Sequence, residues 1–211
     1  MWLLSIILPG LLLTSNACGP ADNEPVEAEN PTPAPDPTPG PQPAGNRALV
    51  VYFSCTNTTK GIADQIVEAT GAAVWRIIPE EAYTSEDLNY NDSSSRATHE
   101  QNDPSARPTI QGKCDALANC DVVFLGYPIW WGMAPKVIYT FLENHDLTDK
   151  TVIPFCTSHS SGIGSSDTDL HRLATGSEWK QGRRFSGNES KETINNWIES
   201  MNLNFNHNTK A

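Results

Sequence analysis

Three stretches of this chain are apolar at nearly every position: residues 47–53 (RALVVYF), 121–127 (DVVFLGY) and 151–156 (TVIPFC). A strand with one face in water alternates apolar and polar residues, whereas a strand covered on both faces is apolar throughout. The three stretches therefore predict central strands of a parallel sheet with helices on both faces. Pro154 lacks the N–H that a sheet hydrogen bond needs, and nothing in the sequence accounts for it.

Helical spacing of apolar residues separates these strands. It runs over about residues 59–70, where Gly71 can cap the end, and recurs after Pro135, which suits the first position of a helix. The clearest case is 194–201, in which Ile, Trp, Ile and Met recur at intervals of three and four residues. The alternation of strand and helix predicts an α/β fold.

Two weaker strands complete the predicted sheet. One spans residues 73–78, where Arg76 suggests an edge, and the other lies somewhere within 178–185. Residues 80–108 are polar and irregular, which predicts a long excursion containing about one turn of helix. Together the elements predict a doubly wound parallel sheet over residues 46–205, with 206–211 as a disordered tail. Ligands of such sheets bind beyond the carboxyl ends of the strands.

The N-terminal segment predicts export. Residues 2–13 are too short an apolar run to span a membrane but suit a signal peptide covering residues 1–17. Ser15 and Ala17 fit an ordinary secretory cleavage site, which would leave Cys18 as a spare thiol. The alternative is that the segment TSNAC, which resembles a bacterial lipobox, directs lipidation of Cys18. We favour lipidation, hence a lipoprotein anchored on the extracytoplasmic side, although Ser15 stands where Leu is usual.

Residues 18–45 predict a disordered tether. Nine of the chain's 16 prolines fall between residues 20 and 43, alternating with small or polar residues, so this stretch favours extended polyproline II. Five of the 25 acidic residues and none of the 14 basic ones precede residue 46, which leaves a net charge of −6 on the remainder. Because nucleic acids bind basic surfaces, we expect no nucleic-acid partner.

Three conspicuous loops follow the central strands. The first is rich in hydroxyls and leads directly into a helix, whose free N–H groups can hold a phosphate without a cation, although surplus capping hydroxyls would look the same. The second carries paired tryptophans suited to a flat aromatic ligand, although at least one should pack under the following helix. The third is rich in hydrogen-bond donors and glycine. The candidate binding residues are Ser54, Cys55, Thr56, Asn57, Thr58 and Thr59; Pro128, Ile129, Trp130, Trp131 and Gly132; and Thr157, Ser158, His159, Ser160 and Gly162.

These loops, in this order, resemble those of the flavodoxin family. VYFSCTNTTK resembles its phosphate loop, with Asn57 where Gly is usual, and GYPIWWG and VIPFCTSHSSGIG are the more specific matches. The resemblance covers about residues 47–203. It implies a five-stranded sheet of order 2-1-3-4-5 and a bound FMN, with its phosphate, ring face and ring edge at the first, second and third loop. The third loop lacks the Tyr that many flavodoxins stack on the ring, and Tyr83 or Tyr90 could replace it.

The resemblance implies an electron carrier, with redox proteins or membrane electron donors as partners and no catalytic residues of its own. Two alternatives remain open: an FMN-dependent reductase of quinones or similar acceptors, and a binding module that has lost the flavin. NAD(P)H is a cytoplasmic reductant, so export favours the carrier. The family's fold alone does not separate these functions.

Cysteine and histidine give little further chemistry. Their spacing shows no metal-ligand pattern, so no metal site is predicted. Cys114 and Cys120 flank a short connection and could form a disulfide in an oxidising compartment, whereas Cys55 and Cys156 are expected to stay unpaired. His159 is either an ordinary surface residue or, if FMN binds, a group near the ring that would favour negative charge on it.

Overall fold

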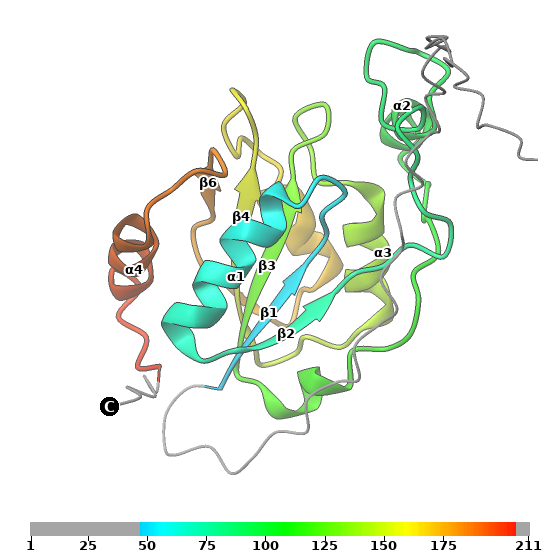
Figure 1. Ribbon diagram of the computed structural model, residues 1–211. Coiled ribbons are helices and arrows are strands. Elements are labelled where there is room, and N and C mark those ends of the chain that lie inside the picture. The colour runs from blue at the N-terminus through cyan, green and yellow to red at the C-terminus, as the bar shows by residue number, and fades with distance from the viewer. Residues whose placement is uncertain (1–46, 206–211) are drawn as a thin grey trace, which may run out of the picture. The chain divides into compact units, whose positions relative to one another are not determined.

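A computed structural model describes residues 47–205 (Figure 1). The predicted signal peptide, the tether with Cys18 and the tail after residue 205 lie outside the described residues. The strands are β1 (Ala48–Tyr52), β2 (Ala73–Arg76), β3 (Val122–Pro128), β4 (Thr151–Thr157), β5 (Glu178–Trp179) and β6 (Arg183–Phe185). The helices are α1 (Thr58–Thr70), α2 (Arg96–Asn102), α3 (Lys136–Asn144) and α4 (Lys191–Glu199), with 3₁₀ turns η1 (Asp115–Asn119) and η2 (Thr168–Leu173). No helix within this range is long and apolar enough to cross a bilayer.

The sheet has the predicted order, β2-β1-β3-β4-β5, and all its strand pairs are parallel. As Arg76 suggested, β2 is an edge strand. α1 and α4 cover one face and α3 covers the other (Figure 1). Consecutive side chains of β1 point to opposite faces, so Leu49 and Val51 join the α3 core while Val50 joins the core under α1.

The fifth position of the sheet departs from the single strand that was expected. β5 and β6 both pair with β4 and are separated by residues 180–182. The Val152 carbonyl accepts from the Lys180 N–H, and the N–H of Ser158, just after β4, donates to the Phe185 carbonyl. Backbone groups at even-numbered positions of this strand therefore point toward β5 and β6. Pro154 lies between Val152 and Ser158, opposite the interruption, where its missing N–H leaves no partner unsatisfied.

Two element boundaries also differ. Pro135 lies one residue before its predicted place, at the N-cap of α3, which begins at Lys136. The excursion contains α2, whose N-cap Ser95 accepts a hydrogen bond from the Thr98 N–H. α2 stands beside the carboxyl ends of the strands (Figure 1), so the excursion adds a wall to the edge of the sheet where ligands bind.

Candidate functional site

The first loop turns directly into the start of α1. Asn57 adopts a left-handed backbone, with φ of 63°, which suits Asn second only to Gly. The Asn57 side chain makes no capping hydrogen bond and no acidic residue occupies the first turn of α1, so the N-terminal N–H groups are available to an anion. The exposed hydroxyls of Thr56 and Thr58 lie 3.2 Å apart at the same end.

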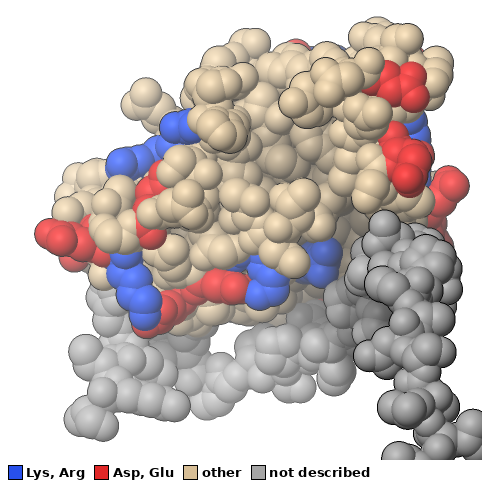
Figure 2. Space-filling view, turned by 45° about the horizontal axis from the view of Figure 1, so that its top comes forward, with Lys and Arg blue, Asp and Glu red and all other residues tan. Residues whose placement is uncertain are grey.

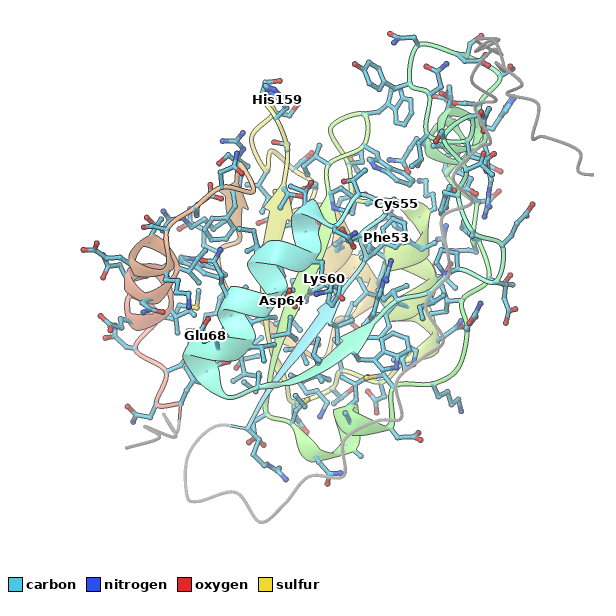
Figure 3. All side chains as sticks on the ribbon, in the orientation of Figure 1. Phe53, Cys55, Lys60, Asp64, Glu68 and His159 are labelled. Atoms are coloured by element: carbon cyan, nitrogen blue, oxygen red, sulfur yellow. The ribbon has the colours of Figure 1, made fainter. Side chains whose placement is uncertain are left out.

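Thr59 ties the first loop to the third. Its side chain is fully buried, and its hydroxyl lies 2.8 Å from that of Thr157 at the end of β4. These two hydroxyls satisfy each other, so they position the loops rather than offer free donors. The one cation on α1, Lys60, pairs at 2.7 Å with Asp64, one turn further along the helix (Figure 3).

The second loop is a two-residue β-hairpin at the end of β3. Trp130 and Met133 exchange two backbone hydrogen bonds of 2.9 Å, and the residues between them, Trp131 and Gly132, both have positive φ (48° and 79°). This is the pattern of a type I′ turn, which favours Gly or Asn at both positions. A tryptophan in this conformation is strained, and the turn holds the Trp131 side chain 44 % exposed.

Trp130 is the tryptophan that packs inward: it is partly buried and packs against the core cluster that includes Val137 and Ile138 of α3. Its ring meets Phe53 and Tyr83 edge-on, with centroids 5.6 and 5.2 Å apart. Its carbonyl accepts a hydrogen bond of 2.9 Å from Gln101 Nε2 on α2. The excursion therefore holds the hairpin from both its side chain and its backbone.

The third loop is braced from β6. The Arg184 guanidinium donates to the Ser158 hydroxyl and to the Ser158 and His159 carbonyls, and the Ser158 hydroxyl donates to the Ser161 carbonyl. The His159 side chain is exposed at the tip of the loop (Figure 3). The sequence analysis did not identify this role of Arg184, although Arg184 lies in the stretch that was predicted to be the last strand of the sheet.

Two adjacent cavities lie between these loops. The first, which we call the polar lobe, measures about 380 Å³ and touches all three loops. The second, the apolar lobe, measures about 360 Å³, touches the first two loops and is bordered by the excursion. The polar lobe is lined by Thr56, Thr58, Pro128, Ile129, Trp130, Thr157, Ser158, His159, Ser186 and Asn188. The apolar lobe is lined by Ser54, Cys55, Thr56, Thr59, Leu88, Tyr90, Ala97, Pro128, Ile129, Trp130 and Trp131.

The cavities contain most of the predicted site and some residues that sequence reasoning missed. Asn57, Gly132, Ser160 and Gly162 line neither lobe; the first two instead shape the turns. Trp131 lines only the apolar lobe, with Tyr90, whereas Tyr83 packs behind Trp130. The missed residues are Leu88 and Ala97 in the excursion and Ser186 and Asn188 after β6. The second pair was detectable in principle, because a polar Ser-Gly-Asn segment follows the last strand at the ligand-binding edge.

Among the residues that the structure describes, no Lys, Arg, Asp or Glu lines either cavity. Figure 2 shows the corresponding surface as a broad area without charged side chains, which gather at its margins. Cys55, at the end of β1 (Figure 3), is partly buried, and this burial raises its pKa to about 12, so it is a neutral thiol at ordinary pH. No group of His, Cys, Asp and Glu within residues 47–205 is arranged to hold a metal ion.

The disulfide considered for Cys114 and Cys120 is not formed. Cys120 is a free thiol, as are Cys55 and Cys156. Cys114 and Cys120 cap opposite ends of the five-residue η1, and six residue steps at the 3₁₀ rise cover about 12 Å, whereas a disulfide needs Cα atoms within about 7 Å. The backbone N–H of Cys114 donates to His145 Nε2, at 3.1 Å.

Comparison with known proteins agrees with this geometry. The sequence model of the family described as Flavodoxin matches residues 47–201. A solved candidate flavoprotein from Bacteroides eggerthii DSM 20697 is 42 % identical, with a TM-score of 0.71 over 75 % of this chain and 99 % of that one. A second, from Bacteroides uniformis ATCC 8492, is 40 % identical, with a TM-score of 0.70 over 74 % and 99 %. A flavoprotein in complex with FMN from Lactobacillus acidophilus NCFM is 21 % identical, with a TM-score of 0.55 over 72 % and 99 %. Among curated proteins, none matches the chain significantly.

Proposed function

The chain belongs to the flavodoxin family, and from that premise we propose that it binds FMN in the polar lobe and transfers electrons. The observation that carries this proposal is that the polar lobe brings together all three loops in one cavity. The loops come from the ends of β1, β3 and β4, which lie side by side in the sheet. The FMN complex of the Lactobacillus acidophilus protein, which has this fold, agrees with the proposal.

The phosphate would be held without a cation. The uncapped N-terminus of α1 offers N–H groups and a partial positive charge, and the Thr56 and Thr58 hydroxyls can donate beside it. Ser186 and Asn188 line the same lobe and add polar groups from the loop after β6. This donor set suits a terminal phosphate, because every contributor is a hydrogen-bond donor and none is an acid.

The remaining walls suit the rest of FMN. Ile129 and Trp130 are apolar and would exclude water from one side of the ring, and Ser158 and His159 would meet its polar edge. When bound, FMN supplies electron transfer in steps of one or two electrons. Apart from His159, none of the described side chains that line the cavities is a usual general acid or base near neutral pH, which supports a carrier over an enzyme.

The second candidate function is an FMN-dependent reductase of quinones or similar acceptors. The apolar lobe favours it, because this lobe opens beside the polar lobe and shares Thr56 and residues 128–130 with it. Anaerobic reductive titration of the FMN-loaded protein separates the two functions. A carrier should take up its two electrons in two resolved steps, whereas a reductase should take them up together and be reoxidised by a quinone with saturation.

FMN binding is tested by titrating the protein with FMN and with riboflavin, which lacks the phosphate. Combining Thr56→Ala with Thr58→Ala removes two donors and should weaken FMN binding about tenfold, at about 0.5–1.5 kcal/mol per hydrogen bond, while leaving riboflavin unaffected. Lys60→Ala is the matched control: it removes a neighbouring cation that pairs away from the cleft, and FMN affinity should not change. Riboflavin binding as tightly as FMN to the unmodified protein would refute the phosphate site.

We also propose the location and partners that the N-terminal sequence indicates. Residues 1–17 would be removed, Cys18 lipidated, and the domain tethered by residues 18–45 on the extracytoplasmic side, where redox proteins or membrane electron donors would reach it. Mass spectrometry of the native N-terminus tests this. A mature chain that begins at Cys18 without acyl groups would refute the anchor while leaving the FMN proposal intact.

A further inference from the structure

The apolar lobe has walls without charge and with exposed aromatic rings. Tyr90 and Trp131 are 73 % and 44 % exposed, and within residues 47–205 the one other large apolar side chain so exposed is Val74. Exposed aromatic side chains gathered at a cavity mark a binding surface, because water is a poor environment for their faces. Two of these three side chains meet at one cavity, which indicates that the cavity has an occupant.

Hydrogen bonds and an ion pair hold the wall of the apolar lobe in place. Its excursion wall is anchored by Arg96, which pairs with Glu100 at 2.7 Å and lies over the Tyr83 ring at 4.2 Å. The Tyr83 hydroxyl donates to Glu100, and Gln101 holds the Trp130 carbonyl. The lining is therefore preorganised, so binding a ligand costs little free energy for ordering these side chains.

We propose that the apolar lobe binds a small, uncharged, flat aromatic molecule, as a site additional to the FMN site. The chemistry of the lining sets this class: within residues 47–205 no charged side chain lines the lobe, so an ion would lose its hydration without compensation. A volume of about 360 Å³ is near the lower end for small-molecule sites, which fits a compact ring system. Cys55 agrees, since its buried thiol is neutral and adds no charge.

The proposal does not require bound flavin, so its test uses the full chain free of FMN. The probes are naphthalene-1-carboxamide and 1-naphthoate, which share a ring system and differ in charge. Calorimetric titration should show saturable binding of the amide and at least tenfold weaker binding of the anion. Equal binding of the two, or binding of neither, would overturn the proposal.

Three variants locate the site. Tyr90→Ala and Leu88→Asp should weaken amide binding about tenfold or more, because the first removes an aromatic face and the second places a charge in the lining. Val74→Ala removes the third exposed apolar side chain, which lies on β2 and lines neither lobe, and should change nothing. Loss of binding in Val74→Ala alone would overturn the assignment.

Repeating the titration with saturating FMN distinguishes this proposal from the FMN assignment. Undiminished amide binding supports a separate site. Competition between FMN and the amide would overturn it, because the lobe would then be the seat of the flavin ring, with FMN binding still intact. Failure of FMN to bind at all would refute the proposed function and leave the calorimetry of the amide unaffected.

Discussion

Gly187→Ala should weaken FMN binding because the added methyl group, in the loop after β6, would displace Thr58 in the first loop. Gly187 has φ of +99°, and a Cβ built there would lie 2.3 Å from Thr58 Cγ2, whereas ordinary contacts are 3.4–4 Å. The two atoms must therefore separate by about 1 Å or more. Thr58 is β-branched and stiff at χ1, so the strain either shifts the start of α1 or turns the Thr58 hydroxyl out of the polar lobe.

The substitution should change both the free energy of unfolding and the affinity for FMN. Overpacking costs about 1–3 kcal/mol, and an alanine in left-handed backbone costs about 1–2 kcal/mol, so the free energy of unfolding should fall by about 2–5 kcal/mol. Loss or misplacement of one phosphate donor should weaken FMN binding roughly three- to tenfold. Urea denaturation measures the first quantity, and flavin fluorescence titration measures the second.

Thr58→Ser isolates the steric part, because it removes Cγ2 and keeps the hydroxyl. In the Gly187→Ala background it should restore FMN affinity and about 1–3 kcal/mol of stability, leaving only the backbone cost. Gly61→Ala is the control within α1: nothing lies within 4 Å of its Cβ, so stability should rise by about 0.5–1 kcal/mol without a change in affinity. Strict additivity of Thr58→Ser and Gly187→Ala would refute the reasoning.

Three further predictions follow from single contacts. Thr59→Val or Thr157→Val should each cost about 1–3 kcal/mol in unfolding free energy by stranding the other buried hydroxyl, whereas the double variant should cost less than either; an additive double variant would contradict this. Cys55 should be alkylated far more slowly than a free thiol at pH 8, with a rate that rises about tenfold per pH unit to pH 10. Its pKa is raised, so its contribution to stability is full below the unfolded value of about 8.5 and is lost as pH rises toward 12; a rate that levels off near pH 9 would argue against the shift. Gly126→Ala should destabilise the core by at least about 1–3 kcal/mol, because its Cβ would lie 2.2 Å from the Phe155 ring, and Phe155→Leu should recover part of that loss in a thermal melt.

The fold was predictable because its strands and helices are recognisable from patterns of neighbouring residues in the sequence. Continuous apolar strands such as Val122–Pro128 and the periodic helix α4 depend on neighbours in the sequence, and parallel order follows from their alternation. The short β5 was harder to place, because two residues carry almost no periodicity. Its division from β6 depends on where Pro154 falls in the neighbouring strand, a pairing that the sequence does not state.

The candidate site was predictable where it follows strand ends and not where tertiary packing builds it. Thr56 and Trp130 come directly after apolar strands and lie in the cleft as expected. Leu88 and Ala97 come from the polar excursion, which tertiary contacts bring to the cleft: Tyr83 packs on Trp130, and Gln101 donates to the Trp130 carbonyl. Thr59 was correctly placed near the site, but its burial against Thr157 gives it a positioning role that spacing cannot reveal.

The interruption between β5 and β6, opposite Pro154, affects how readily copies of this protein aggregate through their sheet edges. An exposed sheet edge can recruit a strand from a neighbouring chain, and long regular edges do so most readily. Here one edge consists of two segments of two and three residues, and the other is the four-residue β2 with Arg76 at its end. Neither edge offers a long template for intermolecular pairing, so this sheet should resist edge-to-edge aggregation even when many copies are crowded together.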